Sequence, residues 1–449
     1  MNYPKYSRTD QFWLKEIPSN WENYKIKHLF SERGEKGYPN EPLLVASQNM
    51  GVVPKNVYGE RTVEAQKDLH LLKLVRIGDF VISLRSFQGG IEYAYYQGII
   101  SPAYTIMIPS EQLVPGYIKY LFKSQPFIGL LKTCVTGIRE GQNIDYQKLK
   151  NYKVPVPPRE EQNRIVRYLD WQVSKINKLI AAKKKEIMRL DELKKAVVND
   201  AVTHGIEANV PMKYSGVEWL GDIPAHWTTI KLRQILRPFS EKNHPDLPLL
   251  SVVREQGVIV RDIEDKDSNH NFIPDDLSGY KLVKKGQFAM NKMKAWQGSY
   301  GISNYTGIVS PAYFVFDVDF DNLEYFHYAI RSKVYVNFFA QASDGIRVGQ
   351  WDLDMDKMKE IPFIVPPDDE QRAIVDYLPV AFEKYDLSIS KLKAEIDVLN
   401  ELKNKLISDV VTGQIDIRGI GIPEYEYTED IIDDVADDAD ISPEVDEND

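Results

Sequence analysis

Two long segments of the chain carry apolar residues at the spacing of a helical seam. In the first, residues 160–203, there is neither Pro nor Gly, and apolar residues recur at intervals of 3, 4 and 7. They are Leu169, Val173, Ile176, Ile180, Ile187, Leu190 and Val197. The second segment repeats the pattern with Leu392, Ile396, Leu399, Leu406 and Val410, and it ends at Gly413. This spacing predicts two coiled-coil helices.

The natural partner of each predicted helix is the other one, because two similar helices on one chain can pack antiparallel. About 40 residues at 1.5 Å per residue make a rod of roughly 60 Å. We expect the rod to hold two globular heads at a fixed separation, at opposite ends and related by a pseudo-twofold axis. Pro379 is expected to break or kink the second helix near its start. The alternative is a solvent-facing helical hairpin used only for dimerisation.

The segments outside these helices have a different pattern. Short apolar or alternating runs at 80–84 and 313–316 are bounded by Gly and Pro and predict strands. Stretches at 117–122 and 325–330 favour short helices. The sequence therefore predicts the α+β class, with two mixed heads and two long antiparallel helices.

The chain is an internal duplication with an offset near 208 residues. Four blocks return in the same order: the Ile-Pro-x-x-Trp block at 17–21 and 223–227, the Ser-Pro-Ala-Tyr block at 101–104 and 310–313, the Gly-Ile-Arg block at 137–142 and 345–350, and the Pro-Pro-x-x-Glu-Gln block at 157–162 and 366–371. Residues 31–75 and 240–284 share almost nothing. A common frame with divergent interiors indicates two domains doing one type of task on two different targets.

These patterns place the boundaries. We expect recognition domains at 1–158 and 206–367, a central spacer helix at 159–205 and a distal one at 368–414. Residues 415–449 are expected to form an acidic, disordered tail.

Composition and charge change the picture in one respect. The net charge is −10, but thirteen acidic residues lie from Glu424 to Asp449, where there is no Lys or Arg, so the chain without this segment carries +3. The expected folded body is therefore mildly basic. No apolar run approaches the roughly 18–20 residues of a membrane span, and the first residues lack a signal pattern. With a single cysteine, Cys134, we expect a cytoplasmic protein without a disulfide or membrane contact.

The sequence carries no motif of a catalytic centre. There is no glycine-rich phosphate loop, no His-Glu-x-x-His and no Cys-x-x-Cys. Pro245-Asp246 with Glu264-Asp265-Lys266 loosely matches a Mg²⁺ nuclease pattern, but the first copy lacks a counterpart. A nuclease using Asp246 and Glu264 and a coiled-coil scaffold without DNA contact remain the alternatives to a DNA-binding function. Cys134 and the tryptophans Trp13, Trp21, Trp219 and Trp227 are expected to be packed in the cores.

Several basic, amide and aromatic side chains favour DNA contact. Arg and Lys can bond guanine, Gln can bond adenine, and aromatic rings can stack or contact a methyl group. The candidates are Lys55, Arg85, Ser86, Phe87, Gln88, Arg139 and Gln142 in the first copy, and Arg254, Lys292, Lys294, Trp296, Gln297, Arg347 and Gln350 in the second. The Arg139–Gln142 pair and its repeat Arg347–Gln350 fit a phosphate-positioning role common to both halves.

Taken together, the repeated blocks resemble the specificity subunit of type I restriction-modification systems. The likeness covers residues 1 to about 418 and rests on the Ile-Pro-x-x-Trp, Ser-Pro-Ala-Tyr and Pro-Pro-x-x-Glu-Gln blocks, each present twice. It implies a chain without catalysis or cofactor of its own, bound to double-stranded DNA. It also implies two methylation subunits that bind S-adenosylmethionine and clamp the helices, and ATP- and Mg²⁺-dependent restriction subunits. The implied target is bipartite, with one half-site for each head and adenine as the methylated base. The acidic tail is not part of the family pattern.

Overall fold

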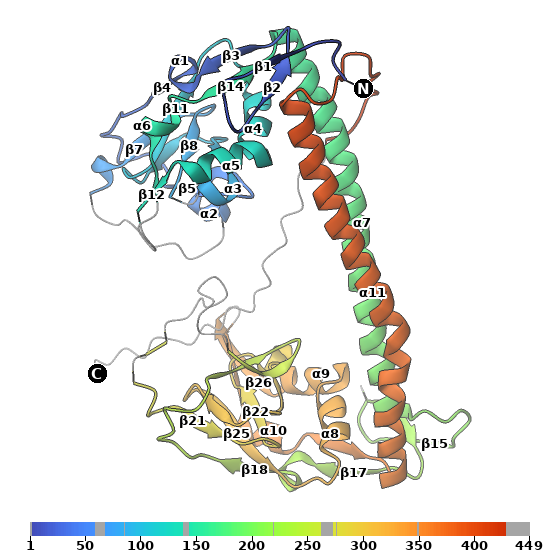
Figure 1. The fold of residues 1–449 in the computed structure, drawn as a ribbon. Helices are drawn as coiled ribbons and strands as arrows, with labels where there is room; N and C mark the ends of the chain where they lie inside the picture. The colour runs from blue at the N-terminus through green and yellow to red at the C-terminus, as the bar shows by residue number, and fades with distance from the viewer. Residues whose placement is uncertain are drawn as a thin grey trace. The chain divides into compact units, whose positions relative to one another are not determined.

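The computed structural model describes residues 2–58, 68–84, 86–137, 143–218, 220–261, 273–274, 276–347 and 350–427, with only the backbone given for 344–347 and 350. The chain forms two compact units (Figure 1). The N-terminal unit comprises Met1–Lys184 and Leu392–Ile432, and the second unit comprises Lys185–Lys391 and Asp433–Asp449. Each unit therefore contains one head and a portion of both long helices.

The head of the N-terminal unit is built around a four-stranded antiparallel sheet. Its order is β4 (Phe30–Glu32), β11 (Thr105–Pro109), β8 (Phe80–Ile82) and β9 (Glu92–Tyr93). Two-stranded ladders surround it: β1 (Tyr6–Arg8) with β2 (Glu16–Pro18), β3 (Glu22–Lys25) with β14 (Lys153–Val156), β5 (Leu44–Ser47) with β6 (Gly51–Pro54), β7 (Lys73–Val75) with β10 (Gly98–Ile100), and β12 (Val135–Thr136) with β13 (Asn143–Ile144). The short helices are α1 (Ile26–Leu29), α2 (Lys55–Tyr58), η1 (Leu69–Leu71), α3 (Ser86–Gly89), α4 (Pro115–Lys123), α5 (Gln125–Thr133) and α6 (Tyr146–Leu149).

The head of the second unit has the same topology. Its sheet has the order β18 (Leu236–Phe239), β25 (Tyr313–Val318), β22 (Phe288–Asn291) and β23 (Tyr300–Ile302). The ladders are β15 (Met212–Tyr214) with β16 (Asp222–Pro224), β17 (Thr228–Lys231) with β28 (Pro362–Val365), β19 (Leu250–Val253) with β20 (Gly257–Val260), β21 (Lys281–Val283) with β24 (Gly307–Val309), and β26 (Ser343–Arg347) with β27 (Gln350–Leu353). Its helices are η3 (Leu232–Gln234), η4 (Ala295–Gln297), α8 (Leu323–Ile330), α9 (Lys333–Gln341) and α10 (Met355–Lys359).

The duplication thus extends to segments whose sequences have diverged. Phe80 pairs with Met107 in the first sheet, and Phe288 pairs with Phe316 at the corresponding point of the second. Residues 31–75 and 240–284 share almost no sequence, yet each contains a hairpin, β5–β6 or β19–β20. Each also contains a strand, β7 or β21, that pairs with the strand just before the Ser-Pro-Ala-Tyr block. The α+β class predicted from the pattern is confirmed.

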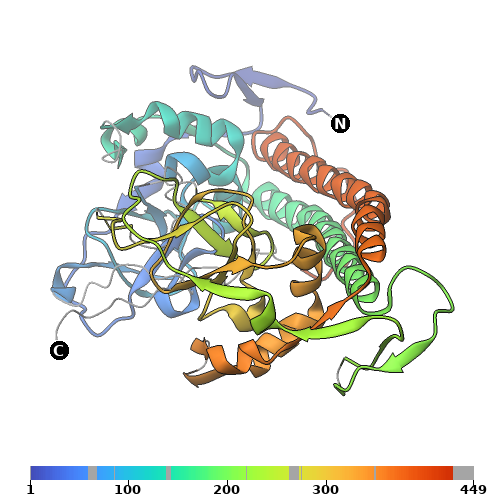
Figure 2. The ribbon, with the colours of Figure 1, turned by 90° about the horizontal axis from the view of Figure 1, so that it is seen from below.

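The long helices are α7 (Arg159–His204) and α11 (Asp368–Val411). In each unit their segments lie side by side and run antiparallel (Figures 1 and 2). In the N-terminal unit Lys183 pairs with Glu395, and Lys403 donates to the Asn177 side chain at 3.4 Å. In the second unit Lys194 pairs with Asp386. Residues later in α7 therefore contact residues earlier in α11, and the predicted antiparallel pairing is confirmed.

Each head is closed by the beginning of one long helix and the end of the other. The N-terminal core contains Leu169 from α7 and Val411 from α11, whereas the second core contains Leu378 from α11 and Val202 from α7. Glycines with positive φ follow the ends of both helices, Gly205 at 80° and Gly413 at 77°. Each lies against the tryptophan of an Ile-Pro-x-x-Trp block, Trp227 or Trp21.

Two sequence-based expectations about the C-terminal part of the chain need correction. Pro379 does not break the second helix, because α11 is continuous from Asp368 to Val411, whereas the alternative of a kink stays a prediction. Residues 415–427 do not belong to a disordered tail, since Ile417 is fully buried and Arg164 donates to the Ile417 and Ile420 carbonyls at 3.2 and 2.8 Å. The rest of the predicted tail, 428–449, lies outside the described residues.

Gly413→Ala should destabilise the N-terminal unit by about 2 kcal/mol or more. A Cβ at this position would lie 2.3 Å from Pro18 Cδ, in a left-handed backbone conformation that L side chains rarely adopt. The change is measured by chemical denaturation. Gly216→Ala, with φ of 84° but open space, should cost only about 1 kcal/mol, and Gly419→Ala should be near neutral. Equal losses for Gly413→Ala and Gly216→Ala would contradict the role of the Pro18 contact.

Candidate nucleic-acid interface

Three of the four repeated blocks have structural roles in the heads. In the Pro-Pro-x-x-Glu-Gln block, Glu161 accepts from Tyr3 Oη at 2.6 Å and from Asn20 Nδ2 at 2.9 Å. Its counterpart Glu370 accepts from Trp227 Nε1 at 2.9 Å and pairs with His226. In both copies a carboxylate in the first turn of a long helix therefore ties that helix to the Ile-Pro-x-x-Trp block.

The glutamine of the same block links the long helix to the segment that leads from the last strand of each head into that helix. Gln162 Nε2 donates to the Pro157 carbonyl at 2.9 Å, while its Oε1 accepts from the Val114 N–H at 2.8 Å. Gln371 Nε2 makes the same bond to the Pro366 carbonyl at 2.9 Å. Both amides are buried, so these bonds satisfy groups that water cannot reach.

The Ser-Pro-Ala-Tyr block forms a turn held by a lysine. The Tyr104 N–H bonds the Ser101 carbonyl, and the Lys73 ammonium donates to the Tyr104 carbonyl at 2.7 Å. Lys281 donates to the Tyr313 carbonyl at the same distance of 2.7 Å. Burial lowers the pKa of Lys73, and nearby Lys36 lowers this pKa further. These three repeated blocks thus form part of the frame of each head.

The predicted segment of the first copy falls at α3. Arg85 lies outside the described residues. Ser86 is buried, and its Oγ accepts from the Ser83 N–H at 2.9 Å. This hydroxyl holds the start of α3 and is not available to a ligand, so its inclusion among DNA contacts is wrong. Phe87 packs against the core, and Gln88 is exposed.

The predicted segment of the second copy packs against the β26–β27 hairpin. Lys292 pairs with Asp352 at 3.2 Å. The Trp296 ring stacks on Trp351, with centroids 5.5 Å apart and an interplanar angle of 26°. Trp351, which the sequence did not single out, is 37% exposed and forms the outer face of this pair. The outer surface here is therefore an aromatic ring flanked by Lys292.

The other candidates lie on separate elements. Lys55 begins α2 and is half-buried, whereas the Arg254 side chain is 54% exposed in the turn of the β19–β20 hairpin. Arg139 and Gln142 lie outside the described residues. Arg347 and Gln350 pair across the end of the β26–β27 hairpin, where only the backbone is described.

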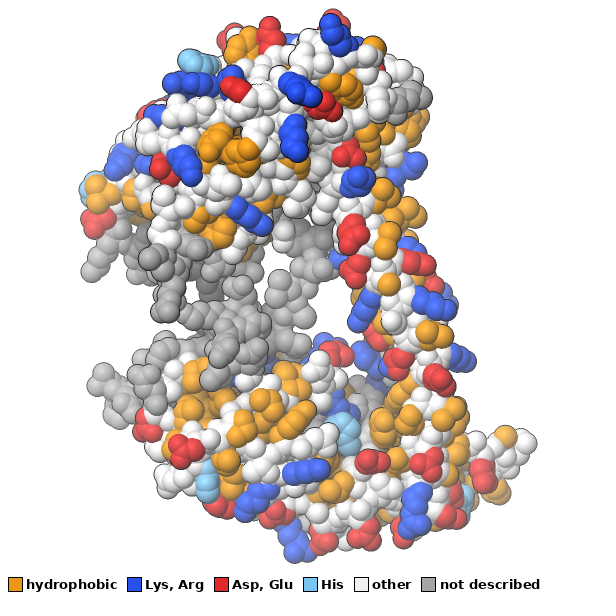
Figure 3. All heavy atoms as spheres, in the orientation of Figure 1, with side chains coloured by type: hydrophobic (Ala, Val, Ile, Leu, Met, Phe, Trp, Pro, Cys, Tyr) orange, Lys and Arg blue, Asp and Glu red, His pale blue; other side chains and the backbone are white. Residues whose placement is uncertain are grey.

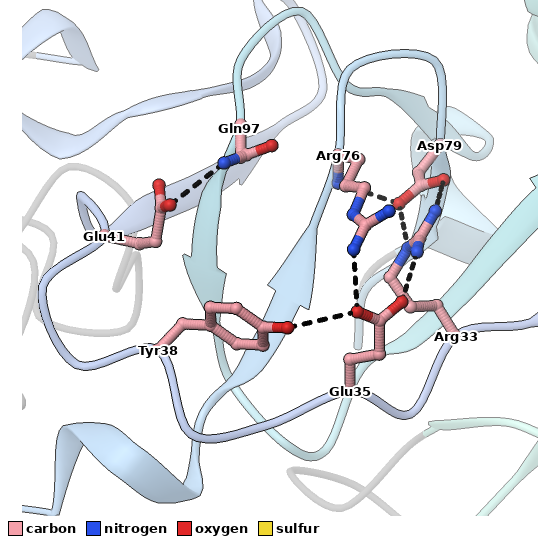
Figure 4. A network of polar contacts seen from close by, with 7 residues as sticks. All are labelled: Arg33, Glu35, Tyr38, Glu41, Arg76, Asp79 and Gln97. Atoms are coloured by element: carbon pink, nitrogen blue, oxygen red, sulfur yellow. Dashed lines mark hydrogen bonds and ion pairs between the residues drawn. The ribbon is translucent and has the colours of Figure 1, made fainter.

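An ionic network, which the sequence did not reveal, anchors the divergent segment of the N-terminal unit (Figure 4). Arg33 donates from Nε and Nη2 to the two Asp79 oxygens at 2.7 and 3.0 Å, and from Nη1 to Glu35 at 2.6 Å. The Arg33 and Asp79 side chains are only 8% and 3% exposed. The Arg33 hydrogen bond holds the pKa of Glu35 below its usual range, and Arg76 adds to this effect.

The second unit builds the same corner with different chemistry. Phe239, the last residue of β18, stands at the position of Arg33 in the first copy, and Gln287 replaces Asp79. The Lys284 ammonium lies 4.8 Å from the Phe239 ring centroid and pairs with Glu241 at 3.0 Å. A buried ion pair and an aromatic contact thus support the same backbone, which explains why the sequence alone revealed no relation here.

Neither the face shown in Figure 3 nor the other candidate groups among the described residues form an alternative functional site. On the face in Figure 3, Lys and Arg side chains of the N-terminal unit are scattered among acidic and apolar ones. Among the described residues, no three His, Cys, Asp or Glu side chains are grouped to hold a metal ion. Glu264, Asp265 and Lys266 of the nuclease alternative lie outside the described residues. No helix in the described part of the chain has the length and hydropathy of a membrane span.

Comparison with known proteins gives one consistent result. Residues 18–189 match the family model of the type I restriction modification DNA specificity domain. The chain is 23% identical over 436 residues to the provisionally named type I restriction enzyme MjaX specificity subunit of Methanocaldococcus jannaschii, covering 90% of this chain and 96% of that protein. It is 22% identical over 435 residues to the MjaVIII specificity subunit of the same organism, covering 90% and 95%.

A solved structure shares the fold. It comes from work on complex assembly and conformational transition of the type I R-M system, and it matches with a TM-score of 0.53 at 14% identity, covering 89% of this chain and 99% of that one. The chain combines a duplicated frame with divergent head segments, and its described residues group no three side chains that could hold a metal ion. By its repeated blocks, its fold and these likenesses, the chain is similar to the specificity subunits of type I restriction-modification systems, whose DNA specificity domain its residues 18–189 match.

Proposed function

We propose that this subunit reads a bipartite double-stranded DNA sequence, with one half-site for each head. One observation carries the proposal: the two heads share topology, strand register and supporting blocks but differ in the side chains of their divergent segments. A frame used twice with different exposed groups fits two domains that present different hydrogen-bonding groups to base edges. Such a protein would work where the chromosome lies, in the cytoplasm.

In this proposal the subunit directs chemistry that partner subunits perform. Two methylation subunits, with S-adenosylmethionine, would modify an adenine in each half-site, and restriction subunits, with ATP and Mg²⁺, would cut the DNA. The relatives named as subunits of restriction enzymes support such an assembly. The long helices also present exposed apolar side chains, which are typical of a protein contact. They are Met188, Val380 and Leu387 in the second unit, and Leu179, Val398 and Leu402 in the N-terminal unit.

The paired helices, in the same proposal, set the number of base pairs between the half-sites. They form continuous elements of 46 and 44 residues, and ion pairs join them within each unit. A stiff spacer plays the part that protein symmetry plays in dimeric repressors. The folded body carries only a small excess of positive charge, so partners would supply much of the phosphate contact.

Exchange of one head should change one half of the target. If residues 31–155 are replaced by the segment of another specificity subunit, the methylated sequence should change in one half-site and keep the other, because each head reads separately. Sequencing of methylated adenines in a host that carries the complex measures the target. The reciprocal exchange of 240–365 is the matched control and should change the other half-site. A target that changes in both halves or in neither would contradict the proposal.

A longer helix pair should give a longer spacer. Inserting one heptad between residues 183 and 194 of α7 and another between 386 and 395 of α11 adds about 10 Å, or about three base pairs of DNA. Both insertions are needed because the helices pair antiparallel within each unit. The spacer is measured by mapping methylated adenines, with the α7 insertion alone as the control. An unchanged spacer in an active double-insertion variant would show that the helices are not the ruler.

A further inference from the structure

The β5–β6 and β19–β20 hairpins have the same backbone and different turn residues. Both ladders join four residue pairs in register and close through three residues, 48–50 in the first head and 254–256 in the second. The residue after each turn is a glycine with positive φ, Gly51 at 76° and Gly257 at 75°. The turns read Gln-Asn-Met and Arg-Glu-Gln, and all but Met50 are exposed. We call these segments the reading turns.

In the second head a half-buried arginine fixes the reading turn. Arg331 follows α8, and its Nη2 donates to the carbonyls of Arg254 at 2.8 Å and Glu255 at 3.0 Å. Its Nη1 donates to the Tyr300 carbonyl of β23 at 2.5 Å. The guanidinium therefore ties the turn to a helix and to the central sheet, through backbone acceptors that any turn sequence offers.

In the first head a lysine holds the corresponding carbonyl. Lys123, the last residue of α4, donates from Nζ to the Gln48 carbonyl at 3.0 Å. The same ammonium pairs with Glu92 of β9 at 2.5 Å, and the Glu92 side chain is only 2% exposed. Burial raises the pKa of Glu92 to about 7, although Lys123 opposes this shift. Gln48 and Arg254 occupy the same hairpin position, so both clamps hold equivalent atoms.

Close packing leaves the reading turns little freedom of position. A Cβ on Gly257 would lie 3.0 Å from Arg331 Nη1, and one on Gly51 would lie 2.7 Å from the Tyr93 carbonyl oxygen. In the second head His327 also faces this corner, where its Nδ1 accepts from the Ile302 N–H at 3.2 Å. Burial lowers the pKa of His327 to about 4, with Arg331 adding to the shift, so the ring is neutral. The turn backbones are held from several sides, while their side chains differ and, except for Met50, belong to exposed residues.

A fixed backbone with exchangeable outward side chains is the arrangement that direct readout requires. Discrimination between bases depends on donors and acceptors held within a fraction of an ångström of the base edge. We propose that the reading turns contact base edges in the major groove, and that Arg331 and Lys123 are positioning residues that set where those contacts fall. This inference rests on the proposed function and names the residues that carry its specificity. Arg254 would bond guanine, and Gln48 would bond adenine.

The test uses the subunit in complex with its methylation partners, with methylated adenines mapped and binding measured on matched and mismatched duplexes. Arg254→Ala should relax one base position of one half-site, with discrimination falling about 10-fold or more. Arg331→Met should relax the same position, and Arg331→Lys should restore it in part. Arg237→Ala is the control, because Arg237 is an exposed arginine of the same unit that pairs with Asp319 on the sheet. It should leave the target and the discrimination between matched and mismatched duplexes unchanged.

The first head gives an independent test. Gln48→Ala should relax one position in the other half-site. Lys123→Met alone would leave Glu92 buried without its partner, so the double variant Lys123→Met/Glu92→Gln is used to keep the head folded. It should relax the position affected by Gln48→Ala, at a melting temperature near that of the parent.

The outcomes separate this inference from the function on which it rests. If the parent complex methylates no bipartite site, the proposed function fails. If the parent does so while Arg254→Ala and Gln48→Ala keep its target unchanged, the reading turns are not base contacts. If Arg331→Met lowers only the melting temperature and the folded fraction keeps its target, Arg331 has a structural role alone and the inference is overturned.

Discussion

The carboxylate in the first turn of each long helix, buried in Glu161 and half-buried in Glu370, is the contact on which the rest of the structure depends. Glu161 and Glu370 both accept hydrogen bonds from the block that begins their head. A carboxylate removed from water costs several kcal/mol unless donors surround it, and a helix N-terminus favours negative charge. The contact therefore brings together the first block of the head, the segment that leads out of its last strand, and the long helix. The ends of the other helix then close the core at Gly413 and Gly205.

The frame so formed tolerates large changes of sequence within it. The corner held by Arg33 and Asp79 in one head is held by Phe239 and Gln287 in the other, yet the adjoining strands keep their register. A buried ion pair and an aromatic contact can support the same backbone because each satisfies the groups it buries. The reading turns follow the same rule, since Lys123 and Arg331 bond backbone carbonyls and leave the turn side chains free to differ.

Sequence patterns correctly predicted the long helices and several core residues, because these follow from the spacing of apolar residues along the chain. The apolar seam residues of α7 and α11 lie buried or half-buried along the helix pair, as their spacing predicts. Trp21, Trp227 and Cys134 lie in the cores. Expectations failed where tertiary contacts outweigh composition. Residues 415–427 precede most of the acidic run but pack on the core through Ile417, and Ser86 looks like a polar loop residue but holds the start of α3.

The sequence alone determined the duplication, the helix pair, the resemblance to specificity subunits and the absence of familiar catalytic motifs. Periodicity and repeated blocks are local properties that need no coordinates. Only the tertiary structure decided which repeated residues are frame, since Glu161 meets Tyr3 across 158 positions of the chain. It also decided that Lys123 and Arg331 hold equivalent carbonyls, a relation that their different residue types conceal. Such contacts depend on backbone atoms, which every residue possesses, and the pattern of side chains therefore leaves no record of them.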